Sequence, residues 1–530
     1  MAARGLAALL GAALLAGCAA APAWRAEPGS EQRRCRERLA AFDAAVAEAG
    51  VADAGAAPVP GFPYLRIDRL LASFAPELPV DADAPRHVDW LARLRERDAV
   101  ARRIEAANLP ASLRARLVHR LPGDDPAAAA NACGERLLAE ELSGPGDGPA
   151  RTALGEAVEA PDHYLDAWRV LGLYPLTRLG IALGYERWRD GYLAAFGEPF
   201  PAAAEVRRYV PGAPPGEALD TEAAARLVRE APRSPLGLLT LEDEAFRRLA
   251  AHHAPVFVIE TRGHDDRPGA PVWRRGPDGP LPAVDTRRPE ADVRLAHTRF
   301  RGAVLPQLVY TLWFPARTRT GPLDILGGRL DGVVWRVTLG EDGRPLIHDS
   351  IHACGCYHLF FPVPPLRRVT VPADRDLREA PLTPGPAPRP GPGERLALRL
   401  AASSHYLVGL ETVPAEGAGG RAYALRPVAE PPRYGRRSLA LPDGGRRSLF
   451  GPDGLVPDTE RLERFLLWPA GIRSPGAMRQ WGTHATVFVG RRHFDEPFLF
   501  EAAFTRPPTN DGAAPRGARR ERRAAGTATR

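Results

Sequence analysis

Residues 333–361 read VVWRVTLGEDGRPLIHDSIHACGCYHLFF, and they decide how the C-terminal half of the chain is expected to fold. Two runs rich in β-branched, aromatic and aliphatic residues flank residues 340–343, Gly-Glu-Asp-Gly. Glycine allows the positive φ that a tight turn requires, and such a turn between two apolar runs is typical of a β-hairpin. The stretch therefore predicts a hairpin that turns at residues 340–343.

The second run of this hairpin contains most of the candidate chemistry of the chain. If residues 344–361 form one regular strand, their side chains alternate between the two faces of the sheet. One face then holds His348, Ser350, His352, Cys354, Cys356 and His358. The other face is mostly apolar and suits a core, with Ile347, Ile351, Ala353, Tyr357, Leu359 and Phe361. The strand predicts one polar cluster, unless a bulge at Gly355 turns the later residues to the opposite face.

The N-terminal part of the chain predicts helices. From Glu31 to about His253, apolar residues recur near helical spacing, and breaks rich in glycine and proline separate the segments. Helices are expected at 31–50, 87–107, 132–142, 221–230 and 241–253, with two more between 162 and 196 that divide near Pro175. We expect residues 31–253 to form a mainly helical domain.

From Ala254 onward the pattern changes to short strands between loops rich in glycine, proline and aspartate. Besides the hairpin, strands are expected at 255–260, 293–300, 307–314, 395–413, 421–428, 436–441, 485–492 and 498–504, with a short helix near 459–467. Residues 254–506 are expected to form a β-rich, sandwich-like domain of mixed or antiparallel sheets with inserted helices, so the predicted fold class is α+β. Residues 507–530 are rich in arginine, have almost no apolar side chain and predict a disordered tail.

The first eighteen residues have the order of features of an export signal. Arg4 precedes an apolar run, Leu6 to Leu15, that is too short to span a bilayer. The run ends in Leu-Ala-Gly-Cys at residues 15–18, which resembles a bacterial lipobox. The resemblance implies cleavage before Cys18, diacylglycerol on its sulfur and a palmitate-type acyl chain on its amine. Several acyl chains give stable anchoring.

The residues after the lipobox bear on where the chain resides. In the pattern that lipoproteins of this kind follow, the absence of aspartate after Cys18 implies sorting to the outer membrane, on its periplasmic side. Residues 19–30, rich in small residues and proline, predict a tether between the anchor and the helical domain. The expected membrane contact is therefore a lipid anchor.

The basic character of the chain does not predict a nucleic-acid partner. The formal net charge is +7 at pH 7, but Arg4 and the arginine-rich tail account for most of it, and the mature body is near neutral. The sequence also has no lysine, which excludes a P-loop, a protein-kinase lysine and a Schiff-base cofactor site.

Four cysteines are left for other roles once Cys18 is assigned to lipid. The periplasm oxidises thiols, so Cys35 and Cys133, which lie in predicted helices of one domain, are expected to form a disulfide. Cys354 and Cys356 allow three interpretations. They form a strained Cys-Gly-Cys disulfide, they serve with histidines as metal ligands, or they are inert thiols.

A metal interpretation rests on the types of residue in the predicted cluster. Thiolate and imidazole groups suit Zn²⁺ or copper, and the candidate ligands are His352, Cys354, Cys356 and His358. Two neighbouring ligands on this strand would need further ligands from other strands. The outer histidines of one extended strand lie too far apart to bind the same metal ion. A cysteine nucleophile with His352, His358 or the remote His405 is the second chemical possibility. No residue pattern singles out a catalytic set, so the catalytic residues are unknown.

The leading functional hypothesis is an envelope lipoprotein, anchored to the outer membrane, that acts as a binding or structural module. The alternative is a metal-dependent or cysteine-dependent hydrolase of envelope material, centred on residues 352–358. The two hypotheses differ in geometry. A pocket in which these side chains meet a histidine or carboxylate from another strand favours the enzyme.

Overall fold

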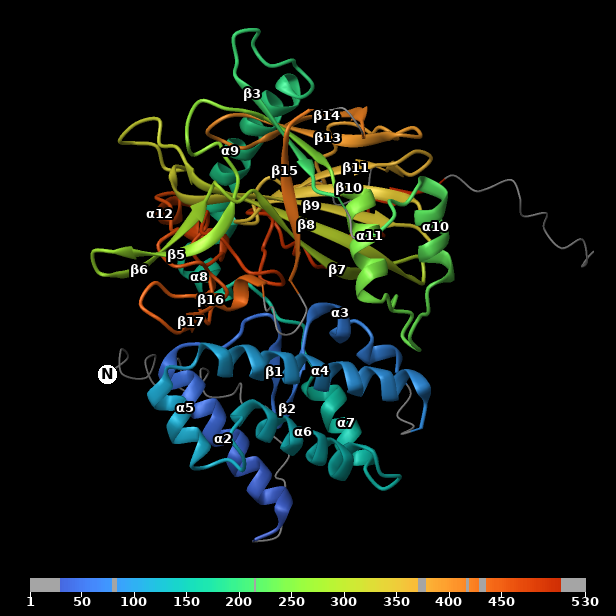
Figure 1. The fold of residues 1–530 in the computed structure, drawn as a ribbon, viewed down its shortest axis with the longest axis vertical. Helices are drawn as coiled ribbons and strands as arrows, with labels where there is room; N and C mark the ends of the chain where they lie inside the picture. The colour runs from blue at the N-terminus through green and yellow to red at the C-terminus, as the bar shows by residue number, and fades with distance from the viewer. Residues whose placement is uncertain are drawn as a thin grey trace, which may run out of the picture.

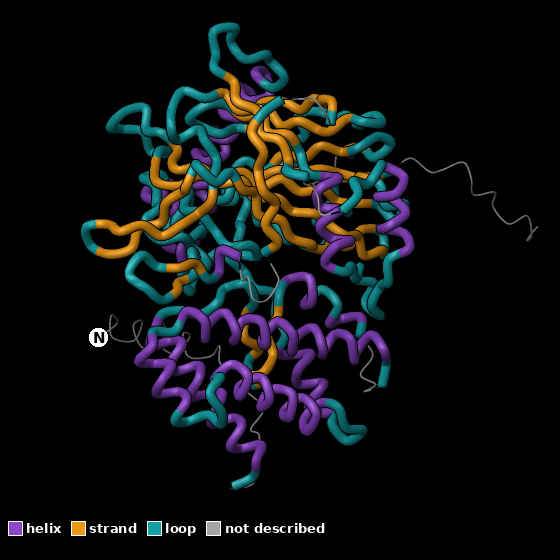
Figure 2. The backbone as a smooth tube through the Cα atoms, in the orientation of Figure 1, coloured by secondary structure: helices purple, strands orange, loops and turns teal. Residues whose placement is uncertain are grey.

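The computed structural model describes residues 29–78, 83–213, 216–369, 378–415, 419–428 and 435–506, and every structural statement below concerns these residues. The predicted signal segment 1–18, the tether as far as residue 28 and the tail 507–530 lie outside the described residues. The α+β class is confirmed. Helices dominate the N-terminal part, and a large sheet dominates the rest (Figures 1 and 2).

The N-terminal unit is a group of helices around a small hairpin, drawn in blue to teal in the lower half of Figure 1. Its helices are α2 (Glu31–Ala49), α3 (Arg69–Ala72), α4 (Pro85–Asn108), α5 (Ala111–Val118), α6 (Pro126–Leu142) and α7 (Gly148–Ala157), with the 3-10 turn η1 (Ala75–Glu77). The hairpin consists of β1 (Ala57–Val59) and β2 (Phe62–Ile67). One hydrophobic core joins them, and it includes Leu39, Phe42, Tyr64, Trp90 and Leu137.

Local signals in the sequence explain both ends of α2. The Ser30 side chain accepts a hydrogen bond from the Arg33 amide and so caps the helix N-terminus. Gly50 ends the helix with φ of 62°, a left-handed conformation that glycine adopts at little cost. The apolar positions of α2 face the core of the unit, with Leu39 and Phe42 fully buried. The predicted boundaries of this helix are confirmed.

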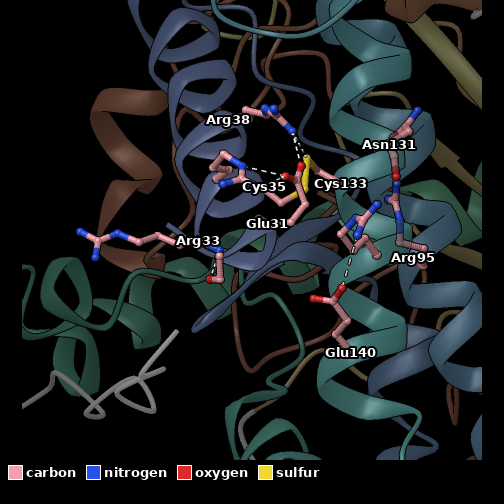
Figure 3. Close-up of a disulfide and its surroundings, with 11 residues drawn as sticks. Glu31, Arg33, Cys35, Arg38, Arg95, Asn131, Cys133 and Glu140 are labelled. Carbon is pink, nitrogen blue, oxygen red and sulfur yellow. Dashed lines mark hydrogen bonds and ion pairs between the residues drawn. A yellow bond between two sulfur atoms is a disulfide. The ribbon is translucent and has the colours of Figure 1, made fainter. Parts of the chain in front are cut away.

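The predicted disulfide between Cys35 and Cys133 is present. It joins α2 to α6, with Cα atoms 5.0 Å apart, and Figure 3 shows it between the two helices. Both cysteines are part of the core. Beside the disulfide, Arg38 donates a hydrogen bond of 2.7 Å to Glu31, which lies two turns earlier on α2. The disulfide therefore ties the first part of α2 to the middle of α6.

The C-terminal unit is built on one curled sheet of ten strands in the order β11-β10-β9-β8-β7-β15-β3-β4-β13-β14. The strands are β3 (Val206–Pro211), β4 (Val256–Glu260), β7 (Glu290–Phe300), β8 (Ala303–Arg317), β9 (Gly328–Leu339), β10 (Pro345–His352), β11 (Leu359–Pro362), β13 (Glu394–Leu400), β14 (Leu407–Pro414) and β15 (Arg421–Pro427). The sheet is mixed, because β15 pairs in parallel with β7 and β3, and β13 pairs in parallel with β4. The predicted hairpin is confirmed as antiparallel β9 and β10, with Gly343 at φ of 73° in the turn.

The two faces of the sheet are covered differently. One face holds the largest hydrophobic core, which includes residues of strands at both ends of the sheet, such as Phe361 of β11 and Leu407 of β14. Helices α10 (Thr221–Glu230) and α11 (Asp243–His253) pack on this core. The other face is covered by the long C-terminal segment, for example at Met478 and Phe494, which pack with Val334 of β9.

The C-terminal segment and the remaining loops contain short elements. These are the ribbons β5 (Ala270–Gly276) with β6 (Gly279–Asp285), β12 (Arg367–Arg368) with β18 (Phe504–Thr505) and β16 (Leu439–Ala440) with β17 (Arg446–Arg447), the helix α12 (Arg464–Leu467) and the turns η3 (Gly435–Arg437) and η4 (Trp468–Ala470). The expected strands at 485–492 and 498–504 are wrong, since these residues form irregular backbone up to β18.

The contacts of the later helices place the division between the two units earlier than residue 253. Helices α8 (Asp166–Leu171) and α9 (Tyr174–Ala195) contact the C-terminal unit, where the Tyr192 hydroxyl of α9 donates to the Leu407 carbonyl and the Arg169 side chain of α8 donates to the Ala470 carbonyl. Strand β3 lies within the ten-stranded sheet. The division therefore lies shortly after α7, and helical periodicity alone could not reveal it because it does not say what a helix packs against. No helix among the described residues has the length and apolar character to cross a bilayer.

We expect reduction of the Cys35–Cys133 disulfide to destabilise the helical unit. The bond closes a loop with a sequence separation of 98 residues. Chain entropy gives such a loop ~4–5 kcal/mol of stabilisation. Calorimetry of the full chain with and without reductant should show a lower midpoint, and Cys35→Ser/Cys133→Ser should match the reduced protein. Cys354→Ser is the control, because Cys354 is a free thiol and the variant should keep the response to reductant. An unchanged midpoint on reduction would contradict the prediction.

Candidate functional site

The segment between β10 and β11 is a reversal of the chain. Strand β10 ends at His352, and β11 begins at Leu359 and returns antiparallel to it, with Ser350 opposite Leu359. The amide of Gly355 donates to the carbonyl of His352 over 2.8 Å, which closes the turn. Gly355 has φ of 95°, in the region that favours glycine. The prediction of one strand through residues 344–361 is therefore wrong.

The two cysteines of this turn are free thiols in the structure, and both are buried. The predicted Cys354–Cys356 disulfide is thus absent. The neighbouring Cys356 thiol lowers the pKa of Cys354. The neighbouring Cys354 thiol and burial raise the pKa of Cys356 well above its usual value. Cys356 is consequently a protonated thiol near neutral pH.

The two histidines of the turn pair with different carboxylates. The Nδ1 atom of His352 lies 3.4 Å from Asp331 of β9, whereas the Nε2 atom of His358 lies 2.9 Å from Asp349 of β10. The predicted cluster of the two histidines and two cysteines is therefore divided. In the described parts of the chain, no group of three or more histidine, cysteine, aspartate or glutamate side chains is arranged to hold a metal ion. The predicted zinc or copper site at residues 352–358 is not supported.

Asp349 is the centre of a buried ion-pair network. Arg336 of β9 donates to both of its carboxylate oxygens, at 2.8 and 2.5 Å, and both side chains are almost fully buried. Burial opposes the negative charge of Asp349, but Arg336 and the hydrogen bond with His358 outweigh it and lower the pKa of Asp349. Burial lowers the pKa of His358 to about 4, so its imidazole is neutral at pH 7. Its Nε2–H donates to Asp349, and its Nδ1 atom has no hydrogen-bond partner among the described residues.

A second buried network lies on β9 and the β13–β14 connection. The Nδ1 atom of His405 is 2.8 Å from Asp331, and its Nε2 atom is 3.4 Å from Asp266. Burial disfavours the charged imidazolium, but the adjacent carboxylates of Asp266 and Asp331 outweigh this and raise the pKa of His405. Arg461 lies 3.6 Å from Asp331. The network therefore alternates positive and negative groups, which keeps its charges compensated.

Beside these networks, a cavity of about 410 Å³ lies between helix α9 and the chain reversal; we call it the α9 cavity. Its wall is largely aromatic and aliphatic. Helix α9 contributes Gly180, Ile181, Gly184, Tyr185 and Trp188, the reversal contributes Cys356, Tyr357 and His358, and other segments contribute Ile325, Leu326, Leu382, Tyr406, Leu466, Leu467, Thr486 and Phe488. Its volume falls in the ~300–1,000 Å³ range of small-molecule sites.

Polar groups in the α9 cavity are few and are separated along the chain. Glu379, Glu463 and Arg492 line it together with His358. Burial raises the pKa of Glu379 to about 7, and it raises the pKa of Glu463 to about 7. The Glu379 carboxylate is held in place by the amides of Phe488 and Val489, at 2.7 and 3.0 Å. Carboxyl groups with such raised pKa values in a cavity are typical of functional sites.

A larger cavity, of about 560 Å³, lies where the two units meet. Its wall contains several charged side chains that already pair with one another, such as Arg66 with Glu105, and Arg437, just outside the wall, pairs with Asp53 of the wall. The polar groups of the α9 cavity are less completely paired, and this distinguishes it as the candidate site.

Sequence reasoning misses most carboxylates of the site. Asp331, between glycines, resembles a turn residue, but it lies in β9 and is 1% exposed. The sequence around Asp266 predicts a solvated turn residue. Asp266 does accept hydrogen bonds from the amides of Arg262 and Gly263, as in a turn, but it is also 1% exposed and paired with His405. Glu379 and Glu463 carry no local signal, because burial by distant segments causes their raised pKa values.

Neither a protein-family model, nor a curated protein, nor a solved structure matches this chain.

We expect Asp349→Asn to lower the free energy of unfolding of the C-terminal unit strongly. The change leaves the Arg336 charge buried without a carboxylate, and breaking a buried pair in this way costs ~3–5 kcal/mol. Denaturant unfolding measures the difference. Asp443→Asn is the matched control, because Asp443 pairs with Arg275 on the surface, with both side chains more than half exposed. Exposed pairs contribute ~0–1 kcal/mol, so equal losses in both variants would be inconsistent with this account.

Because of the two cavity carboxyls, we expect the protein to lose stability as the pH rises from 4.5 to about 7. The folded state binds their protons more tightly than the unfolded chain, because their pKa values rise from 4.5 to about 7 on folding. The resulting stabilisation is complete below pH 4.5 and is lost as the pH rises through about 7. Glu379→Gln and Glu463→Gln should each remove part of this loss, up to roughly 3 kcal/mol.

Thermal midpoints between pH 5 and 8 measure this effect. Glu341→Gln, at an exposed position in the β9–β10 turn, is the control and should follow the wild-type profile. Parallel pH profiles for the wild type and both cavity variants would show that the two carboxyls do not titrate in this range.

Proposed function

We propose that the protein is an envelope lipoprotein, anchored to the outer membrane on the periplasmic side, that binds an amphipathic small molecule in the α9 cavity. The observation that carries the proposal is the composition of the cavity wall, which is mostly apolar with a few polar groups at one site. This is the usual composition of a small-molecule site. The lipid anchor is supported by the resemblance of residues 15–18 to a lipobox.

The polar groups of the cavity restrict the head group of the ligand. The free Nδ1 atom of neutral His358 accepts a hydrogen bond, and the carboxyls of Glu379 and Glu463 accept hydrogen bonds when ionised. With three potential acceptors, the site favours a head group with several N–H or O–H donors, such as an amine, an amide or a polyol. The aromatic side chains Tyr357, Tyr406 and Trp188 suit an apolar body.

A cysteine-dependent hydrolase is the second candidate. It is favoured by one observation, that Cys356 and His358 both line the α9 cavity while Asp349 orients the imidazole. The raised pKa of Cys356 opposes it, because the thiolate is the nucleophile and the thiol is not. Turnover of p-nitrophenyl esters that is lost in Cys356→Ser would favour the hydrolase over the binding module.

Filling the cavity should abolish binding without damage to the fold. Gly184 lies on the cavity wall, and a Cβ atom added there would meet no other described atom within 4 Å, so the backbone accepts a side chain here and Gly184→Phe adds a ring at the wall. A glycine in a helix interior is ~1 kcal/mol less favourable than alanine, so its replacement does not by itself weaken the helix. We expect the wild type to bind the neutral fluorophore N-phenyl-1-naphthylamine and Gly184→Phe to lose at least tenfold in affinity.

Gly191→Phe provides the matched control for this experiment. Gly191 lies on the same helix, an added Cβ atom there also has no described atom within 4 Å, and the residue is not part of the cavity wall. The affinity of this variant for the fluorophore should equal that of the wild type. If both variants bind like the wild type, the α9 cavity is not the binding site.

The anchor is tested separately. Cys18→Ala removes the sulfur that would carry diacylglycerol, so the variant should leave the membrane fraction or accumulate as an unprocessed precursor. Fractionation and the mass of the N-terminal peptide measure both effects. An unchanged distribution between membrane and soluble fractions would argue against the lipoprotein assignment.

A further inference from the structure

Most of the exposed large apolar side chains among the described residues lie around the α9 cavity. We call this surface the apolar collar, and it consists of Val170, Leu171, Leu173, Leu176, Leu179 and Leu183 on α8 and α9 with Leu462, Phe465 and Leu466 near α12. Leu176 is 66% exposed, Leu183 is 68% exposed and Phe465 is 62% exposed. Clustered exposure of this kind marks an interaction surface, whereas scattered apolar residues do not.

The spacing of the leucines shows that α9 has two apolar sides. Leu176, Leu179 and Leu183 follow one another at intervals of three and four residues, which places them on one stripe of the helix. Trp188 and Tyr192 pack instead against the core of the sheet. A surface helix with one covered side needs no second apolar stripe. The exposed stripe is therefore available to a partner.

The collar lies next to the α9 cavity. Gly180, Ile181 and Gly184, which lie between and beside the exposed leucines on α9, belong to the cavity wall. On the other side, Leu466 is both an exposed collar residue and part of that wall. A partner that covers the collar would therefore also cover this part of the cavity wall.

Arginines lie within the collar, and carboxylates border it at Asp166, Glu186 and Glu460. Between Asp166 and Glu186 the sequence contains Arg169 and Arg178 and no carboxylate, and of these two the Arg169 guanidinium is bound to the carbonyls of Ala470 and Gly490. On the opposite side, the Arg464 guanidinium lies 4.8 Å from the centre of the Phe465 ring. Two half-buried tryptophans, Trp168 of α8 and Trp468 of η4, pack edge to face 6.4 Å apart.

Leucine, phenylalanine and tryptophan together with arginine are typical of segments that lie in the interface of a bilayer. The basic residues complement anionic lipid head groups. A symmetric contact with a second copy of the chain would instead place the same arginine-bearing patch against itself, and these charges would repel one another. The arginines within the collar, Arg178 and Arg464, therefore favour a lipid surface over a dimer.

We propose that the apolar collar docks on the surface of a phospholipid bilayer and that the ligand of the α9 cavity is a lipid or acyl chain that enters directly from that bilayer. This deepens the proposed function and rests on it. The tether from Cys18 to Gly29 spans at most ~40 Å, so an anchored chain stays close to the membrane. Anchoring raises the effective concentration of lipid at the collar, so even weak docking is sufficient.

Vesicle sedimentation tests the docking surface. The mature chain from residue 19, exported by a non-lipoprotein signal so that it has no acyl group, is mixed with vesicles of phosphatidylethanolamine and phosphatidylglycerol. We expect the wild type to sediment with these vesicles and to bind pure phosphatidylcholine vesicles less. Leu176→Glu/Leu179→Glu should lower the partition coefficient at least tenfold, because both positions are exposed and neither belongs to the cavity wall.

Val88→Glu is the control, since Val88 is 50% exposed on helix α4 of the other unit, away from the collar. It should bind vesicles like the wild type. The proposal is overturned if the wild type does not bind vesicles, or if Val88→Glu loses binding equally. It is also overturned if sedimentation velocity shows a wild-type dimer that Leu176→Glu/Leu179→Glu converts to a monomer, because the collar is then an interface between copies.

The failure of docking and the failure of ligand binding are distinguishable. Gly184→Phe should still bind vesicles while it loses N-phenyl-1-naphthylamine, and Leu176→Glu/Leu179→Glu should still bind that fluorophore in solution. Transfer of a fluorescent phospholipid from vesicles to the protein should need both surfaces and be lost in both variants. If Leu176→Glu/Leu179→Glu accepts the phospholipid at the wild-type rate, the ligand does not enter through the collar.

Discussion

The ion pair between Arg336 and Asp349 is the constraint on which the C-terminal unit depends. The two residues lie directly opposite each other on β9 and β10, and both are almost fully buried. Removing two charges from water is costly, and only complete hydrogen bonding offsets that cost. A slip of one residue between the strands would separate the charges and turn every side chain of β10 to the other face. The pair therefore makes one register much more favourable than its neighbours.

The same pair also fixes segments that are distant in sequence. Arg336 donates a hydrogen bond to the carbonyl of Phe494 and lies 3.8 Å from the centre of its ring, which holds the C-terminal segment against the sheet. Asp349 accepts a hydrogen bond from His358, so it sets the direction in which the chain returns after Gly355. The position of His358 on the wall of the α9 cavity thus follows from an interaction made inside the sheet.

Local features can be predicted from the sequence, and features that depend on distant contacts cannot. The β9–β10 turn and the Ser30 and Gly50 caps of α2 are determined within a few residues, and the Cys35–Cys133 disulfide follows from the residues left to pair. The sequence marks Gly355 as a place where a bulge could interrupt the strand, but the alternation of polar and apolar residues continues through it, so the full reversal is not predicted. Asp331 looks like a turn residue because its partner, His405, lies 74 positions later. The raised pKa values of Glu379 and Glu463 depend on burial by several segments at once, which no spacing encodes.

The properties of the α9 cavity and of the apolar collar depend on the same physical quantity, the amount of water near the cavity. The carboxyls of Glu379 and Glu463 have raised pKa values because burial already removes most of that water. A bilayer against the collar would replace more of it with hydrocarbon, which strengthens electrostatic interactions inside the cavity. A lipid that moves between the two places would keep its apolar chain out of water, and its head group would gain acceptors from the protein as it leaves the interface. On this argument, membrane contact and ligand binding favour each other, and by linkage a ligand in the cavity must strengthen contact with the membrane to the same extent.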